Sequence, residues 1–199
     1  MSAQRRGEKT RSRILEAAAE SFARYGYDAT GVAEICRRAG VTKGAFYHHF
    51  SSKQTLFTSL LERWLNDLDA QLEAAAVGAA TVPEKLLHMA EMFRPIFEMA
   101  DGNIPIFFEF WTQAGHDPEI WQATIAPYRR YCTFFAHMIE AGIAEGTLRD
   151  VDPEAAAQIL VSLAVGLLLQ LLLDPQGVDR TEMAVEGVRM LLQGMERKE

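Results

Sequence analysis

Apolar residues recur along this chain at intervals of three and four positions, the spacing that places them on one face of an α-helix. The strict alternation of apolar and polar residues that marks a β-strand is missing, and so are Asn-Gly hairpin turns. The pattern therefore predicts an all-α protein with about nine helices. The expected helices cover residues 8–25, 31–38, 43–49, 51–76, 83–100, 104–113, 119–145, 153–173 and 179–195.

Residues that favour helix ends stand at several of these boundaries. Gly26 follows the first helix and can adopt the left-handed conformation that ends a helix. Thr42 is a natural N-cap for the third helix. Ser51 and Gln54 have the spacing of a capping box at the start of the fourth.

Two short helices joined by a tight turn are expected over residues 31–49. Gly40 suits the left-handed position of the turn, and Val41 fills the angle between the helices. Phe46 and Phe50 are four residues apart, so they share the face that packs inward. This arrangement predicts a helix-turn-helix, whose second helix fits the major groove of DNA. The alternative is a helical hairpin that only packs in the core and does not bind DNA.

The opposite face of the second short helix carries side chains suited to DNA. Lys43 can reach a phosphate or a guanine edge, and both Tyr47 and His48 can donate to phosphate oxygens. Gly44 would let the backbone approach the groove wall closely. Lys53 lies in the first turn of the next helix, where backbone amides favour anions.

The net charge of -7 and the pI of about 5.3 argue, taken alone, against a nucleic-acid partner. However, residues 1–63 hold 11 basic and 6 acidic residues, net +5, whereas residues 64–199 hold 9 and 21, net -12. This division indicates a basic, nucleic-acid-binding part and an acidic body. Basic residues crowd the start of the first helix, where cations oppose the helix dipole, so we expect phosphate contact there; a solubilising tail is the alternative. They are Arg5, Arg6, Lys9, Arg11 and Arg13.

This part of the chain resembles the DNA-binding region of the TetR family of bacterial one-component repressors. The resemblance covers about residues 8–60, and the turn, tyrosine, phenylalanine and lysine agree in register. The matching positions are Thr30, Ile35, Ala39, Gly40, Val41, Thr42, Gly44, Tyr47, Phe50, Lys53 and Leu56. Gly31 departs from the family pattern, which usually has Thr or Ser there, and Cys36 stands where Ala is usual.

The resemblance implies a helix-turn-helix DNA-binding domain, placed over residues 1–55, and a helical ligand-binding and dimerisation domain over residues 56–199. We include Thr30 and Thr42, which belong to the same motif, among the DNA-binding candidates. The implied function is that of a homodimeric repressor released from a palindromic operator by a small molecule. A ligand-independent DNA-binding protein and an activator are the alternatives.

The last two helices are apolar enough to form a subunit interface. Apolar residues cover most of the circumference over 160–173, so this helix must be buried on most sides. The alternative is that both helices only close the core of a monomer. The run is shorter than the roughly 20 residues that a membrane span needs, so no membrane association is expected. On this hypothesis, Leu167→Glu should produce monomers.

Residues 93–135 are unusually aromatic. Core packing accounts for any one of these rings, but together with a few polar groups they also describe a pocket for a largely apolar ligand. The candidate ligand-binding residues are Trp64, Phe93, Phe97, Phe107, Trp111, Trp121, Tyr128, Phe135 and His137. Pro95 and Pro127 interrupt helices, either as hinges beside the pocket or as irregularities that packing tolerates.

The sequence lacks the motifs of an enzyme or a metalloprotein. A Gly-rich phosphate loop, Gly-x-Ser-x-Gly and His-Glu-x-x-His are all missing. His48 and His49 would point about 100° apart on a helix, so they cannot easily hold one metal ion. Cys36 and Cys132 cannot form a disulfide framework, and no apolar stretch of a secretory signal opens the sequence. We therefore expect a cytoplasmic, non-enzymatic protein without a cofactor or a metal.

Overall fold

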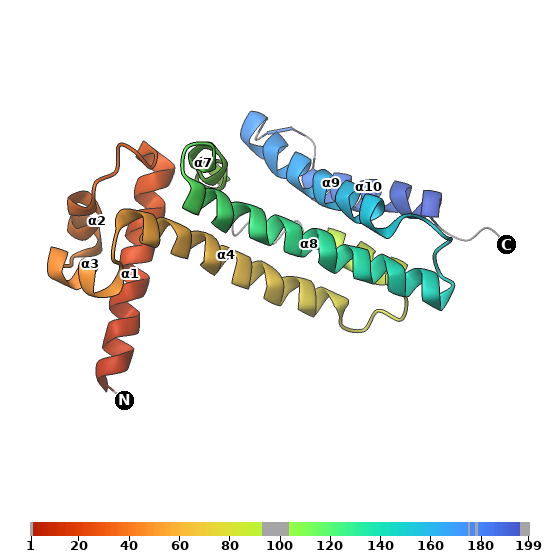
Figure 1. Ribbon diagram of the computed structural model, residues 1–199, viewed down its shortest axis with the longest axis horizontal. Helices are drawn as coiled ribbons and strands as arrows, with labels where there is room; N and C mark the ends of the chain where they lie inside the picture. Colours follow the sequence, from red (N-terminus) through yellow and green to blue (C-terminus); the bar gives the residue numbers. More distant parts are fainter. Residues whose placement is uncertain (1, 93–103, 175, 178, 196–199) are drawn as a thin grey trace. The chain divides into compact units, whose positions relative to one another are not determined.

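Figure 1 shows the computed structural model, which describes residues 2–92, 104–174, 176–177 and 179–195. Over these residues the chain forms nine helices and no strand, so the predicted all-α fold is confirmed. The helices are α1 (Ser2–Tyr25), α2 (Val32–Ala39), α3 (Lys43–His49), α4 (Lys53–Ala76), α5 (Val82–Glu91), α7 (Ile104–Ala114), α8 (Pro118–Glu145), α9 (Pro153–Leu173) and α10 (Arg180–Met195).

Several helix ends lie where the local sequence predicts them. Gly26 and Gly40 have positive φ angles of 80° and 62°, the left-handed conformation that glycine adopts without a steric penalty. The Thr42 hydroxyl accepts a hydrogen bond of 3.1 Å from the Ala45 amide and thereby caps α3. Asp152 caps α9 in the same way. Helix α1, in contrast, begins at residue 2 and not at residue 8.

The start of α4 differs in detail from the capping box expected at Ser51 and Gln54. The hydroxyl of Ser52 accepts a 3.0 Å hydrogen bond from the Thr55 amide, so the capping residue lies one position later. The amide of Gln54 instead donates to both carboxylate oxygens of Asp117, at 3.1 Å each. Gln54 thus uses its amide NH2 as a donor to another helix end, whereas a capping box would use its side-chain oxygen as an acceptor.

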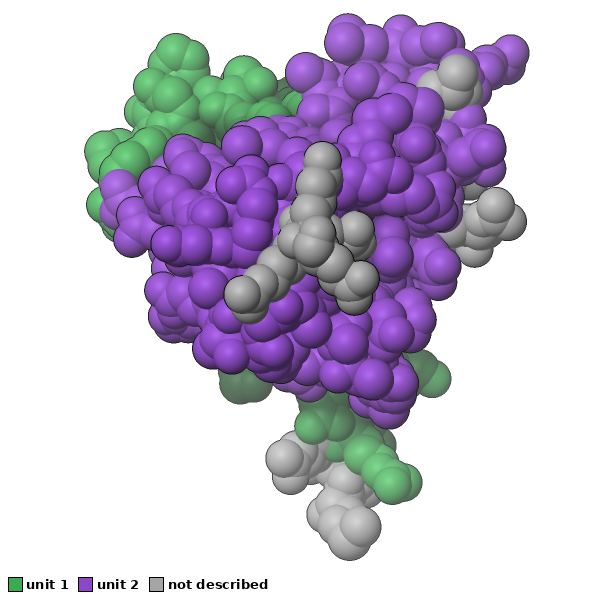
Figure 2. Space-filling view, turned by 90° about the vertical axis from the view of Figure 1, so that its right-hand side faces the viewer, with its two compact units in different colours: residues 1–66, 101–124 green, residues 67–100, 125–199 purple. Residues whose placement is uncertain are grey.

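The chain divides into two compact units, which Figure 2 shows in different colours. The first comprises residues 1–66 and 101–124, and the second comprises residues 67–100 and 125–199. These units are defined by packing, whereas the domains expected from the sequence are defined by function. The domain boundary between residues 55 and 56 therefore remains a prediction.

The core of the first unit joins the helix-turn-helix to a later part of the chain. Helix α7 packs against α1, and the ring of Phe110 on α7 stacks on Phe57 of α4 with a centroid distance of 3.9 Å. A polar contact also joins α7 to the loop after α1, because Glu109 accepts a 3.3 Å hydrogen bond from the backbone amide of Tyr27. Helix α7 is therefore part of the same packed body as α1 and α4.

The second unit is a helical body in which α10 packs against both α5 and α9. Gly187 permits this approach of α10 to α9, because a Cβ atom at that position would lie only 2.8 Å from the Leu163 side chain. Asp69 links α4 to α8, since it accepts hydrogen bonds from the Tyr131 hydroxyl at 2.7 Å and from Arg130 at 3.0 Å. Leu167 of α9 lies in the core of this unit.

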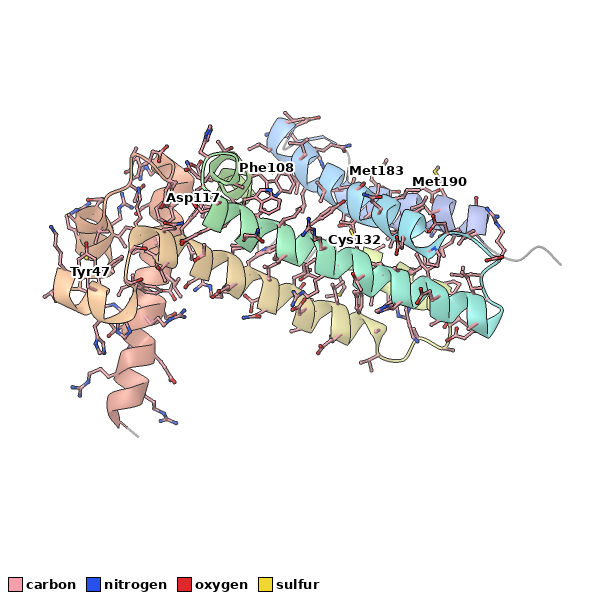
Figure 3. All side chains as sticks on the ribbon, viewed as in Figure 1. Tyr47, Phe108, Asp117, Cys132, Met183 and Met190 are labelled. Carbon is pink, nitrogen blue, oxygen red and sulfur yellow. The ribbon has the colours of Figure 1, made fainter. Side chains whose placement is uncertain are left out.

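Apolar side chains on α9 and α10 also reach the surface of the single subunit. On α9, Ile159 is 52% exposed and Leu173 is 72% exposed. On α10, Met183 and Met190 are exposed and seven residues apart, so they lie along one side of the helix (Figure 3). By length and composition α9 is apolar enough to cross a membrane, a property it shares with core helices of soluble proteins.

Candidate DNA-binding surface

Helices α2 and α3 are joined by a tight turn whose backbone groups are well satisfied. The amide of Gly40 donates to the carbonyls of Cys36 and Arg37, and the Val41 amide donates to Cys36 at 3.0 Å. Gly31 is the N-cap of α2 and offers no side-chain hydrogen bond, as expected from the missing Thr or Ser. This geometry is that of a helix-turn-helix.

Helix α3 is fixed by its two phenylalanines. Phe46 is fully buried and Phe50 is 2% exposed, with their ring centroids 5.9 Å apart. The guanidinium of Arg11 on α1 lies 5.2 Å from the centroid of Phe50. One face of the short helix is thereby committed to the core, which sets the direction of the opposite face.

The opposite face of α3 presents the residues that the sequence predicts to contact DNA. Tyr47, labelled in Figure 3, is 55% exposed. Lys43, Gly44 and His48 are exposed beside it. The ring of His48 makes an edge-to-face contact with His49, whose pKa is lowered by burial and by the neighbouring His48 and Arg11. Four of the seven DNA-binding candidates thus share one exposed surface.

The two threonines among the candidates have different environments. Thr42 is exposed at the start of α3, where its hydroxyl oxygen caps the helix and its hydroxyl proton can still be donated. Thr30 is 1% exposed, and its hydroxyl donates to the carbonyl of Gly26 at 2.8 Å. The structure therefore gives Thr30 a hydrogen-bonding role inside the protein, joining the end of α1 to the start of α2.

Lys53 is also engaged within the protein. Its ammonium group donates to the carbonyl of Tyr27 at 2.8 Å and lies 4.0 Å from the centroid of the Tyr27 ring. Burial lowers the pKa of Lys53, although the carboxylates of Asp28 and Glu109 oppose this effect. The side chain joins the start of α4 to the loop after α1. Its contact with DNA phosphate remains a prediction.

The basic residues at the start of α1 fall into two groups. Arg5, Arg6, Lys9 and Arg11 have exposed side chains and form a cationic surface, and Arg13 is exposed as well. Arg13 instead donates to the carbonyls of Ala39 and Gly40 at the turn between α2 and α3. Sequence reasoning missed this second role. The signal in the sequence was the C-terminal end of α2, because the last carbonyls of a helix have no partner within it and need donors from elsewhere.

A second charged cluster stabilises α2. Glu34 accepts hydrogen bonds from Arg37 and Arg38 at 2.6 Å and 2.7 Å. These two bonds lower the pKa of Glu34 to about 2. Arg38 also donates to the hydroxyl of Tyr25 at 2.9 Å and so ties α2 to the end of α1.

The candidate ligand-binding residues are distributed over both units. In the first unit Trp64 packs against the core, Trp111 makes an edge-to-face contact of 5.2 Å with Phe108, and Trp121 is 41% exposed. In the second, Tyr128 and Phe135 are half-buried on α8, and His137 is exposed. Phe93 and Phe97 lie outside the described residues, as does the side chain of Phe107. A common pocket for these residues remains a prediction.

Pro127 lies inside α8, as the sequence indicates, and Pro95 lies outside the described residues. Within the described part of the chain, no three His, Cys, Asp or Glu side chains are grouped so that they could hold a metal ion.

Comparisons with known proteins agree with this geometry. Residues 14–60 match the family model described as bacterial regulatory proteins of the tetR family, and residues 82–193 match that of the BetI-type transcriptional repressor C-terminal domain. The HTH-type transcriptional regulator AcrR of Shigella flexneri is 29% identical over 195 residues, which cover 94% of this chain and 89% of that protein.

Solved structures resemble the chain over most of its length. The regulator PfmR from Thermus thermophilus is 30% identical, with a TM-score of 0.74 over 93% of this chain and all of that chain. A regulator from Saccharomonospora viridis in complex with choline is 23% identical, with a TM-score of 0.82 over 96% of this chain and all of that one. The second likeness concerns the fold alone.

Proposed function

The chain belongs to the TetR family of bacterial regulatory proteins, and we propose on this basis that it represses transcription from a palindromic operator that it binds as a homodimer. Proteins of this family are DNA-binding transcriptional regulators and not enzymes, they function as dimers, and they are generally cytoplasmic. We propose a cytoplasmic location for this chain too. We assign DNA binding to residues 1–55, and ligand binding and dimerisation to residues 56–199.

The exposed face of α3 carries the proposal for DNA binding. Lys43, Tyr47 and His48 reach the surface from a helix that two buried rings hold in place. Side chains of these types bind phosphates and base edges in a major groove. Gly44 and the exposed hydroxyl of Thr42 complete this surface, whereas the buried Thr30 is no longer among the residues that we propose to contact DNA.

Selection of duplexes from a random-sequence library tests this proposal directly. The wild-type protein should enrich a motif with two related half-sites about 34 Å apart or a multiple of that distance, because each subunit presents one recognition helix. Affinity for the enriched duplex should fall steeply with salt, since phosphate contacts release counterions. Enrichment of no motif, or a flat salt response, would contradict the assignment.

We propose that the homodimer forms through α9 and α10. The apolar side chains that both helices expose support this, since exposed apolar side chains gathered on neighbouring helices commonly mark an interface. Gly166 and Gly194 add to the argument, because a Cβ atom at either position would meet no other atom of the subunit within 4 Å. These glycines leave room for a close approach of the partner's helices.

The effector that we propose is a hydrophobic small molecule bound among the aromatic residues of the body. The candidates in the described residues are Trp64, Trp111, Trp121, Tyr128, Phe135 and His137. Aromatic side chains with a few polar groups are the usual lining of such sites. A thermal-shift screen of hydrophobic compounds should find ligands that raise the unfolding temperature and also release the selected duplex.

The same measurements distinguish the alternatives. If compounds from the screen stabilise the protein but never change its affinity for DNA, the ligand-responsive mechanism fails. Stabilisation by no compound would favour a ligand-independent DNA-binding protein. In vitro transcription from a promoter that carries the selected duplex separates a repressor from an activator, because a repressor lowers the transcript yield.

A further inference from the structure

Arg13 differs from the other basic residues of α1 in what it binds. Its guanidinium Nη2 donates to the carbonyl of Ala39 at 2.5 Å and to that of Gly40 at 3.3 Å. These acceptors are 26 and 27 residues away in the sequence and belong to a different helix end. A side chain that appears in the sequence as one member of a phosphate-binding cluster is therefore directed at the protein's own backbone.

The acceptors lie at the carbonyl end of α2, which leaves groups without partners in its own helix. The turn satisfies part of this end by itself, because the amides of Gly40 and Val41 donate to Cys36 and Arg37. Arg13 donates to the carbonyls of Ala39, the last residue of α2, and of Gly40, its C-cap. Its positive charge also lies at the negative end of the α2 dipole, where cations are favourable.

Glycine at position 40 leaves the space that this contact uses. A Cβ atom built on Gly40 would lie 2.7 Å from Nη2 of Arg13, closer than such atoms approach one another. The φ angle of 62° at Gly40 also favours glycine there. The position that ends α2 is thus the position that admits the guanidinium of α1.

The turn that Arg13 contacts leads directly into α3, the proposed recognition helix. Thr42 caps α3 and Lys43 begins it, three residues after Gly40. Phe46 and Phe50 fix the inward face of α3, but the start of the helix depends on the turn before it. The turn that Arg13 contacts is therefore the segment that joins α2 to Lys43 and Gly44 at the start of α3.

We propose that Arg13 is a positioning residue for DNA recognition: it orients the start of α3 through the turn between α2 and α3 and does not itself bind phosphate. The inference rests on the proposed DNA-binding function of this surface. Base contacts depend on the placement of the recognition helix, whereas non-specific phosphate contacts tolerate small shifts. Loss of Arg13 should therefore reduce specificity more than general affinity.

The test compares Arg13→Gln with Arg6→Gln, which removes the same charge from an exposed position on the same helix. Two probes are used: a duplex that the wild-type protein selects from a random library, and a shuffled duplex of equal length and composition. For Arg13→Gln we expect the affinity for the selected duplex, divided by that for the shuffled duplex, to fall about tenfold. The salt slope, which is the slope of log affinity against log salt concentration, should be unchanged. Arg6→Gln should weaken binding to both duplexes alike and, if Arg6 contacts a phosphate, reduce the slope by about 0.9.

Circular dichroism shows whether Arg13→Gln is folded, and the binding measurements are made well below its unfolding midpoint. Should it unfold, Arg13→Lys decides, because lysine keeps the charge but lacks the planar fork of arginine. If Arg13 is a positioning residue, Arg13→Lys should lose specificity while the dependence of its affinity on salt stays unchanged. If Arg13 contacts phosphate, Arg13→Lys should bind DNA almost as well as the wild type. Equal losses on both duplexes with a lower slope, or no change at all, would overturn the proposal. If the wild-type protein selects no motif, the proposed function fails as well, before any variant is compared.

Discussion

At the scale of single residues, Tyr47 is the most direct probe of the DNA-binding surface, since its ring is 55% exposed on α3. We expect Tyr47→Phe, which removes only the hydroxyl, to weaken binding to selected and shuffled duplexes by the same factor. The factor should be about two- to tenfold, because one hydrogen bond is worth about 0.5–1.5 kcal/mol. Gel-shift titration of both duplexes measures it. Tyr47→Ala should weaken binding further, and an unchanged affinity in both variants would remove Tyr47 from the contact surface.

Glu34 provides a prediction about pH. Arg37 and Arg38 lower its pKa from 4.5 to about 2 in the folded protein, so the carboxylate favours folding wherever it is ionised. Its contribution should be complete above pH 4.5 and should disappear as the pH falls towards 2. Urea unfolding of the wild type and of Glu34→Gln should therefore give curves that differ at pH 6 and converge near pH 2. A difference that persists at the lowest pH would show that the ion pairs are not its cause.

Three residues that the sequence suggests for DNA contact make hydrogen bonds within the protein, and two of them reach partners far away in the sequence. Thr30 lies next to the N-cap of α2, but its hydroxyl turns back to the end of α1. Lys53 meets the ring of Tyr27, and Arg13 meets the turn at Gly40. Helical spacing identifies which face of a helix is apolar, but it does not show which carbonyl a long side chain will reach.

At the scale of secondary-structure elements, the capping of α3 leads to a testable expectation. Thr42→Ala removes the acceptor for the Ala45 amide and should lower the free energy of unfolding by about 1 kcal/mol. Thr42→Ser keeps the hydroxyl oxygen and is the matched control. Urea denaturation followed by circular dichroism measures both. If the serine variant loses as much stability as the alanine variant, capping is not the relevant interaction.

The elements themselves were predictable to different degrees. The bounds of α3 agree with the prediction, because Thr42, Phe46 and Phe50 are local signals with strong conformational preferences. The packing of α7 against α1 was not predicted, since the chain order places α7 in the body. Its position depends on the stacking of Phe110 on Phe57, a contact between residues that no local pattern relates.

At the scale of the whole molecule, the division of charge agrees with two parts that have different partners. The net charge of +5 over residues 1–63 lies on the part that carries the recognition helix, whereas residues 64–199 carry -12. An acidic body is repelled by DNA phosphates, so only the basic part is attracted to them. The charge of the whole chain, -7, is an average that hides this difference.

The interface of the homodimer can be tested more sharply than the sequence alone allows. Leu167→Glu, the substitution first expected to give monomers, is unsuitable because Leu167 is 3% exposed in the core of the second unit. A glutamate there would bury an unpaired charge and unfold the subunit. Met190, which is 63% exposed on α10, is the better position.

We expect Met190→Glu to leave the subunit folded and to raise the dimer dissociation constant at least about a hundredfold, or about 3 kcal/mol, because each subunit would bring one unpaired charge into the interface. Val77→Glu is the control, since Val77 is 78% exposed in the loop between α4 and α5, outside the proposed interface. Sedimentation equilibrium measures both variants. Intact dimers in Met190→Glu would place the interface elsewhere, and monomers in Val77→Glu would show that added charge alone separates the subunits.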